Sequence, residues 1–203
     1  MDTSLTALAI SCTLKLSPAS SSSDLLARQL LDALAEHGVT GDLVRAVDHD
    51  IRPGVEKDMG DGDQWPALRQ RVLDADILVF VTPTWMGQHS SVAQRVLERL
   101  DAELSETDEQ GRPILFDKVA IAGVLGNEDG AHHISAILFQ ALNDIGYTIP
   151  AQTSVYWNGE AMQTVDYKDL DETPEAVSSA IATATRNAAH LARQLTAQAY
   201  PAE

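Results

Sequence analysis

The sequence contains one cysteine, Cys12, among its 203 residues. A single cysteine cannot form a disulfide within the chain and cannot supply a cysteine-based zinc site. No apolar stretch approaches the ~20 residues that a transmembrane helix needs. The N-terminus has no basic segment followed by an apolar core, so we expect no secretory signal. These absences together predict a cytoplasmic protein without membrane insertion.

Positive charge is also scarce. The chain has 14 Lys and Arg against 30 Asp and Glu, which gives a formal net charge of -16. Nucleic acid and anionic membrane surfaces bind proteins through Lys and Arg, which replace counterions, so a strongly acidic protein repels both. We therefore expect neither as a partner.

Motifs of several enzyme classes are missing. There is no Gly-x-Ser-x-Gly, which disfavours a Ser-His-Asp hydrolase. There is no Gly-x-Gly-x-x-Gly after the first apolar run, which disfavours a dedicated dinucleotide fold. His132 and His133 are adjacent, so on a helix their side chains point apart, and no carboxylate–histidine spacing accompanies them. We expect no metal site.

What the chain does have is a regular alternation of apolar runs and helical patterns. The expected strands are 5–12, 43–47, 76–81, 119–125 and 148–156, and the expected helices are 24–37, 66–73, one from Ser90 or Ser91, 132–143 and 174–199. Residues 49–63 and 105–113 have the composition of loops. This alternation predicts an α/β fold, a doubly wound five-stranded parallel sheet with helices on both faces. At this length we expect residues 1–203 to form a single domain.

A hydroxyl-rich loop, Ser17-Pro18-Ala19-Ser20-Ser21-Ser22-Ser23, joins the first expected strand to the first helix. Strand, hydroxyl loop and helix start would aim backbone N–H groups and hydroxyls at one spot, where the helix dipole favours an anion. A flexible linker that ends in a helix N-cap is the alternative. The loop alone leaves both interpretations open.

Two more post-strand loops are rich in special residues. Pro83-Thr84-Trp85-Met86-Gly87 follows the third strand, and Gly126-Asn127-Glu128-Asp129-Gly130 follows the fourth. In a sheet of order 2-1-3-4-5, strands one, three and four lie side by side, and ligands bind at the carboxyl ends of such strands. The three loops therefore predict one binding site.

On these three loops the chain resembles the flavodoxin-like FMN family, in particular its NAD(P)H-dependent FMN reductase branch. The resemblance covers the order of elements along the whole chain. It implies a flavodoxin-like fold, FMN as cofactor and NADPH or NADH as co-substrate. Family members hold the FMN phosphate with hydroxyls and backbone N–H groups, often without a basic residue. They are commonly dimers or tetramers, so the resemblance also implies a homo-oligomer.

The resemblance assigns cofactor contacts in three groups. The phosphate falls to Ser17, Ser20, Ser21, Ser22 and Ser23, the ring to Pro83, Thr84, Trp85, Met86 and Gly87, and the flavin edge to Gly126, Asn127, Glu128, Asp129 and Gly130. The chain departs from the family at Leu16, where a glycine is usual, and in the greater length of the segment from Cys12 to Leu16. Trp85 could instead be a core or interface aromatic, and Glu128 and Asp129 also suit a helix N-terminus.

The sequence therefore predicts an FMN-binding, NAD(P)H-dependent oxidoreductase that passes electrons through the flavin to a quinone, a free flavin or a similar small-molecule acceptor. The cofactor carries the chemistry in such an enzyme, so no catalytic residue is assigned. Two alternatives stay open: a flavodoxin-type electron carrier, and a flavodoxin-like protein that has lost its cofactor. Carriers typically shield the ring with aromatics in both flanking loops, and the third loop has none.

Overall fold

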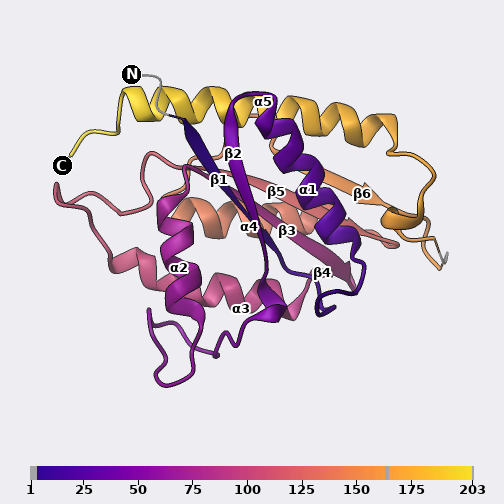
Figure 1. Cartoon of the computed structure of the whole chain (residues 1–203), viewed down its shortest axis with the longest axis horizontal. Helices are drawn as coiled ribbons and strands as arrows, with labels where there is room; N and C mark the ends of the chain where they lie inside the picture. The colour runs from indigo at the N-terminus through magenta and orange to yellow at the C-terminus, as the bar shows by residue number, and fades with distance from the viewer. Residues whose placement is uncertain (1–3, 163–164, 203) are drawn as a thin grey trace.

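The computed structural model describes residues 4–162 and 165–202 and shows a β-sheet with helices packed on both faces (Figure 1). The strands are β1 (Leu5–Ser11), β2 (Val39–Arg45), β3 (Ile77–Trp85), β4 (Gln88–His89), β5 (Val119–Gly126) and β6 (Ser154–Asn158). The α-helices are α1 (Ser22–Ala35), α2 (Trp65–Asp74), α3 (Ser91–Leu100), α4 (Ala131–Asp144) and α5 (Glu175–Ala197). Three short 3-10 helices are η1 (Ala46–Asp48), η2 (Asp101–Ser105) and η3 (Tyr167–Asp169). The single domain predicted for 1–203 includes residues 1–3, 163–164 and 203, which lie outside the described residues.

The strand order is β2-β1-β3-β5-β6, and every neighbouring pair on this path is parallel. Counted along the chain as five parallel strands, this is the predicted order 2-1-3-4-5. The predicted fold class, a doubly wound parallel sheet with helices on both faces, is thus confirmed. The short strand β4 pairs antiparallel with the end of β3 and is the one strand of the described residues that lies off this path.

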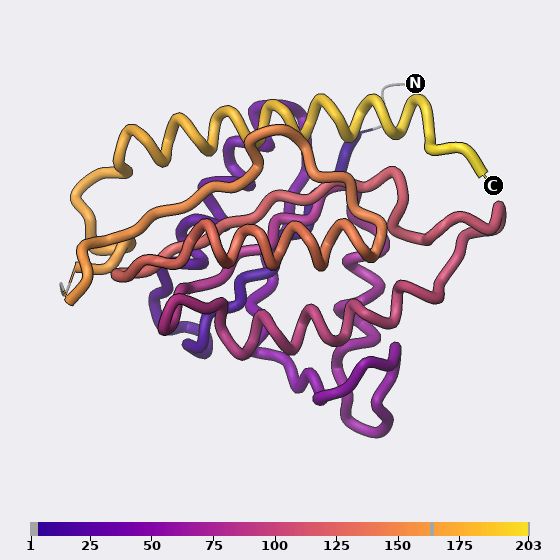
Figure 2. Tube along the Cα trace, turned by 180° about the vertical axis from the view of Figure 1, so that it is seen from behind, coloured from indigo at the N-terminus to yellow at the C-terminus, as the bar shows by residue number. Residues whose placement is uncertain are grey.

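Two helical layers bury the two faces of the sheet. Helices α1 and α5 pack on one face, and α2, α3 and α4 pack on the other. Figures 1 and 2, taken from opposite sides, place α5 along the top of both views and α3 low in both. Strand β3 shows why the central strands have continuous apolar runs: Val79 faces the α1 layer while Phe80 faces the other, and both are fully buried.

Three strand predictions were wrong at their boundaries. The third strand was predicted at 76–81, but β3 continues to Trp85, because it pairs with β5 through Pro83 and with β4 through Trp85. The second strand was predicted at 43–47, but β2 starts at Val39 and residues 46–48 form η1. Pairing with β1 over its whole length, from Leu5 to Ser11, overrides the weak strand propensity of Gly41 and Asp42. The fifth strand was predicted at 148–156, but β6 covers 154–158. Only a single bridge forms earlier, between Thr148 and Val119, because Pro150 and the positive φ of Gln152 interrupt the ladder.

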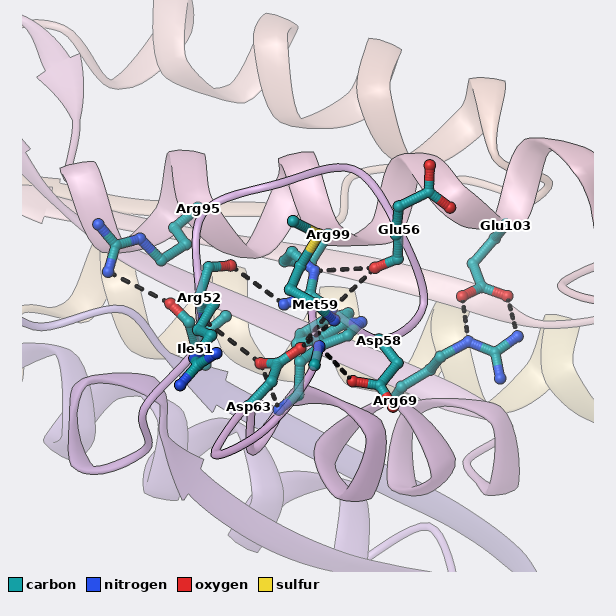
Figure 3. Close-up of polar contacts among 12 residues, drawn as sticks. Ile51, Arg52, Glu56, Asp58, Met59, Asp63, Arg69, Arg95, Arg99 and Glu103 are labelled. Atoms are coloured by element: carbon teal, nitrogen blue, oxygen red, sulfur yellow. Dashed lines mark hydrogen bonds and ion pairs between the residues drawn. The ribbon is translucent and has the colours of Figure 1, made fainter.

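The long loop between η1 and α2 is organised around a buried arginine, as Figure 3 shows. Arg99 of α3 donates from Nε to the Glu56 carbonyl at 3.0 Å and from Nη1 to the Arg52 carbonyl at 3.0 Å. Its Nη2 lies 2.8 Å from Asp63 Oδ2, and neither side chain is exposed. The prediction that 49–63 is a loop is confirmed, and this ion pair holds it in one shape.

Asp63 in turn accepts hydrogen bonds from the loop backbone. The N–H of Met59 donates at 2.9 Å, that of Trp65 at 3.2 Å and that of Arg52 at 3.3 Å. Burial by itself raises the pKa of a carboxyl, but here the Arg99 guanidinium and the three N–H groups outweigh it and hold the pKa of Asp63 well below its usual range.

We therefore expect Asp63→Ala to lower the free energy of unfolding by about 3–5 kcal/mol, because it leaves the buried Arg99 guanidinium without its carboxylate. The difference in stability between the wild-type chain and Asp63→Asn should be full at neutral pH. It should shrink as the pH falls below about 4, where the unfolded carboxyl takes up a proton. Urea unfolding at a series of pH values measures both.

The exposed ion pair between Asp42 and Arg71 is the matched control. Asp42→Ala removes the same kind of contact in solvent and should cost about 0–1 kcal/mol. Equal losses for the two variants would contradict the organising role of Asp63.

Candidate functional site

A cavity of about 370 Å³ opens where the neighbouring strands β1, β3, β5 and β6 end. Its volume lies within the range of roughly 300–1,000 Å³ that is typical of small-molecule sites. It is lined by Thr13, Leu14, Lys15, Ser21, Ser22, Ser23, Pro83, Thr84, Trp85, Leu125, Gly126, Asn127, Glu128, Trp157, Asp166 and Tyr167. Residues from all three predicted loops therefore meet at one place.

The predicted site residues divide into two groups. Those that line the cavity are Ser21, Ser22, Ser23, Pro83, Thr84, Trp85, Gly126, Asn127 and Glu128. Those that the structure places outside the lining are Ser17, Ser20, Met86, Gly87, Asp129 and Gly130. Met86 and Gly87 of the second group bind the lining residue Glu128, and Gly130 packs against Gly87, as described below.

Ser17 is held away from the cavity by Asp48 of η1. It donates to Asp48 from its backbone N–H at 2.9 Å and from its hydroxyl at 2.5 Å. The hydroxyl bond is the main cause that lowers the pKa of Asp48, followed by the backbone bond. The start of the serine loop is therefore tied to η1, which follows β2.

The end of the serine loop forms the N-terminus of α1. Ser21 is the N-cap, with extended backbone angles, and its hydroxyl accepts from the N–H of Asp24 at 3.5 Å. The first N–H groups of a helix have no partners inside the helix, so they are available to a ligand. The hydroxyl of Ser22 accepts from the N–H of Lys168, at 3.3 Å. The end of the serine run is thus the start of a helix, with Ser21 as its N-cap. The linker interpretation of the loop had also predicted an N-cap at this place.

The second loop is a tight hairpin between β3 and β4. Trp85 pairs with Gln88, which leaves Met86 and Gly87 as a two-residue turn with φ of 54° and 72°. Positive φ at both positions is the geometry of a type I′ turn, the usual connection of two-residue hairpins. The sequence prediction missed β4, because a two-residue strand leaves no periodic signal.

Glu128 of the third loop fastens this hairpin. Its carboxylate accepts from the N–H of Met86 at 2.9 Å and from the N–H of Gly87 at 3.0 Å. A carboxylate that binds two backbone N–H groups makes charge-assisted bonds, which are stronger than neutral ones. The second and third loops are therefore joined through Glu128, besides any role of that residue at the start of α4.

Gly130 lets the same two loops approach each other. Its φ is +144°, and a Cβ there would lie 2.9 Å from both the Cα and the carbonyl oxygen of Gly87. Backbone atoms cannot yield as a flexible side chain can. The glycine is therefore required by close approach and by conformation together.

One residue of the cavity wall, Thr84, has a buried polar atom without a partner among the described residues. This atom is its side-chain hydroxyl oxygen. A buried hydroxyl without a partner costs about 1–3 kcal/mol, so such groups are normally satisfied. Thr84 lines the cavity, and a ligand with a polar edge would supply the missing bond.

The sequence prediction missed the residues that follow β6. Trp157 and Tyr167 line the cavity with ring centroids 5.5 Å apart. The hydroxyl of Tyr167 donates to Oε1 of Gln29 in α1 at 2.7 Å, and Asp166 accepts from Nδ2 of Asn127 at 3.2 Å. No motif marks Asp166 or Tyr167. Trp157, at the end of a strand, could have been found by extending the fifth strand.

The residues before Ser17 were also missed. Thr13, Leu14 and Lys15 line the cavity. Their position directly after β1 was the available signal.

His132 and His133, at the start of α4, contact different partners. His132 Nε2 lies 3.1 Å from the Tyr156 hydroxyl, and His133 Nε2 lies 3.2 Å from Gln88 Oε1.

Comparison with known proteins gives a family match. The family model described as NADPH-dependent FMN reductase matches residues 5–161. A Streptomyces davaonensis protein named 8-demethyl-8-aminoriboflavin-5'-phosphate synthase is 31% identical over 201 residues, which cover 94% of this chain and 78% of that protein. A Mycobacterium bovis protein named divalent metal cation transporter MntH is 44% identical over 169 residues. That match covers 81% of this chain but only 25% of the longer relative. In the described residues no helix has the length and apolar character to cross a membrane.

Solved structures agree with this assignment. RosB, whose crystal structure holds 8-demethyl-8-formylriboflavin-5'-phosphate, has a TM-score of 0.87 at 31% identity, with 97% of this chain and 82% of that chain covered. A flavone reductase structure has a TM-score of 0.67 at 16% identity over 97% of this chain and 66% of that one. At that lower identity the likeness concerns the fold.

The close approach of the second and third loops can be tested at Gly130. We expect Gly130→Ala to lower the free energy of unfolding by about 2 kcal/mol more than Gly111→Ala, because the new methyl group meets the Gly87 backbone. Gly111 also has positive φ, +80°, but open space around its Cα, so it is a control for backbone strain alone. Equal losses in thermal or urea unfolding would refute the close-approach argument.

Proposed function

The chain belongs to the NADPH-dependent FMN reductase family, and on that premise we propose that it is an oxidoreductase that uses bound FMN, oxidises NADPH or NADH, and reduces a small-molecule acceptor such as a quinone or a free flavin. When bound, the flavin supplies the electron chemistry, because it accepts a hydride from a reduced nicotinamide and passes electrons on. The chain itself contributes binding, orientation and electrostatics.

The observation that carries the proposal is the buried Thr84 hydroxyl in a cavity built from three loops. An isoalloxazine ring has carbonyl oxygens and ring nitrogens along its edge, so a ring beside Thr84 would give this hydroxyl a partner. Trp85, Trp157 and Pro83 offer apolar surface for the ring faces. The residues present therefore fit a flavin.

We propose that Ser21, Ser22 and Ser23 bind the FMN phosphate with their hydroxyls and with the N–H groups of the first turn of α1. Gly126 and Asn127 then lie at the ring edge, and Glu128 acts by holding the Met86-Gly87 turn. Gly87 and Gly130 act through the close approach of their loops. Ser17, Ser20 and Asp129 receive no contact in this proposal.

We further propose that 1–203 is a single domain that works in the cytoplasm as a homo-oligomer, a dimer or a tetramer. Exposed apolar side chains around the cavity support the oligomer: Leu14 and Leu16 between β1 and the serine loop, and Trp85 and Met86 in the second loop. Clusters of exposed apolar residues commonly mark contact surfaces. The acidic net charge supports the absence of nucleic acid and anionic membranes among the partners.

A second candidate function is modification of the flavin itself. The TM-score of 0.87 with RosB, against 0.67 with the flavone reductase, favours it, because the RosB structure holds a formyl derivative of riboflavin 5'-phosphate. In this candidate the flavin mononucleotide enters the same cavity as a substrate.

One set of measurements separates these candidates. We expect the purified chain to take up FMN, seen as a shift of the visible flavin spectrum, and then to oxidise NADPH or NADH in the presence of a quinone. The flavin recovered afterwards should have an unchanged mass. A new flavin mass would favour modification, and tight FMN without nicotinamide turnover would favour an electron carrier. No FMN binding would overturn every flavin-dependent function.

The phosphate assignment has its own test in the serine loop. We expect the double variant Ser22→Ala, Ser23→Ala to weaken FMN binding about 10- to 30-fold, since each lost hydroxyl bond is worth about 1 kcal/mol. Fluorescence titration of FMN measures it. Ser20→Ala is the matched control, because Ser20 belongs to the same serine run but does not line the cavity. An unchanged affinity of the double variant would refute the assignment.

A further inference from the structure

A charged pair lies behind the serine loop, outside the cavity lining. Asp24 stands in the first turn of α1, directly after the three cavity serines, and Arg45 is the last residue of β2. Arg45 donates from Nε to Asp24 Oδ2 at 3.0 Å, and its Nη2 contacts the same oxygen. Only 9% of the Arg45 side chain and 12% of the Asp24 side chain are exposed. Because the pair is largely withdrawn from solvent, salt screens it weakly.

Two further bonds tie this pair to the cavity loop. Ser11, at the end of β1, donates its hydroxyl to Asp24 Oδ1 at 2.5 Å. Arg45 donates from Nη1 to the carbonyl of Lys15 at 3.0 Å. Lys15 lines the cavity. One arginine therefore neutralises the buried carboxylate and also fixes the orientation of a peptide group in the loop that would surround a phosphate.

The negative charge of Asp24 lies at the end of α1 that would also bind an anion. An uncompensated carboxylate in the first turn of α1 would occupy the favourable end of the helix dipole and repel a second anion beside it. Within the described cavity lining, Lys15 is the single cation, and Glu128 and Asp166 are anions. The cavity lining thus has little positive charge with which to attract an anion. Because Arg45 cancels the charge of Asp24, a dianion bound there is repelled less.

We propose that Arg45 is a positioning residue that makes the serine loop selective for a phosphomonoester over the corresponding alcohol. It does so by neutralising Asp24 and by holding the Lys15 carbonyl. The inference rests on the proposed function, because it takes Ser21, Ser22 and Ser23 as the phosphate site. Neither Arg45 nor Asp24 lines the cavity, so both act through the loop.

The test compares FMN with riboflavin, which lacks only the phosphate. We expect the wild-type chain, freed of flavin, to prefer FMN, and Arg45→Met to lower the ratio of the two affinities about 10-fold or more. Asp24→Asn should leave the ratio equal or raise it, because the charge of Arg45 is then unopposed. The double variant Asp24→Asn, Arg45→Met should return the ratio to within about 3-fold of wild type, because both charges are gone.

A merely structural role for the pair gives a different result. If Arg45 only stabilises the loop, its removal weakens FMN and riboflavin alike and the ratio stays constant, which overturns the inference. Arg45→Lys keeps the positive charge but loses the fork of donors, so it should lower the ratio less than Arg45→Met does. If Arg45→Met does not fold, the Asp24→Asn and double variants decide, and a fall of the ratio in Asp24→Asn overturns the inference. Asp42→Asn, in the exposed pair with Arg71, is the charge-matched control and should change nothing.

Failure of this inference differs from failure of the proposed function. A wild-type chain that binds riboflavin as tightly as FMN refutes the serine loop as the phosphate site. A wild-type chain that strongly prefers FMN, with Arg45→Met showing the same preference, refutes only the role of Arg45.

Discussion

The parallel pairing of β1, β3 and β5 is the constraint on which the rest of the molecule depends. Parallel neighbours must be joined by crossovers, and each crossover helix starts at the carboxyl end of a strand. The register aligns Ser11 with Val81 and Pro83 with Leu125, so the three strands deliver their loops to one edge. Loops far apart in the sequence therefore meet there, and helix N-termini face the same space. The position of the cavity is therefore set by the order and register of the strands, and the side chains of the loops line it.

The fold and the centre of the site could be predicted from the sequence because their signals are local. From Ile77 to Val81 strand β3 is buried on both faces and is apolar throughout, and the loops after β1, β3 and β5 stand out by composition. Long-range partners decided the rest. Pairing with β1 extends β2 across Gly41, and the hydrogen bond from Tyr167 to Gln29 brings a segment without any motif to the cavity wall. Nothing local to Ser17 indicates that Asp48 holds it away from the cavity.

Ionic contacts in this acidic chain work mainly at its connections. Arg99 shapes the loop before α2, Arg45 ties β2 to the segment that leads into the serine loop, and Glu128 joins the second loop to the third. Each contact has a defined geometry that an apolar contact lacks, although buried ion pairs add little net stability. The apolar layers provide the stability, and the few buried charges determine how the connecting segments lie on them. In this protein, with its net charge of -16, the few buried arginines thus serve mainly to position the connecting segments.

The single thiol of the chain, Cys12, can report transient opening of the sheet edge beside the cavity. It is fully buried at the junction of β1 and the first loop, with its N–H bonded to the Val81 carbonyl and its own carbonyl to the Ser90 hydroxyl. Burial raises the pKa of this thiol and keeps it out of reach of alkylating reagents in the closed state. Labelling then proceeds only during transient openings of the strand end beside the cavity. With no second thiol to compete, the rate of alkylation reports how often that edge of the sheet opens.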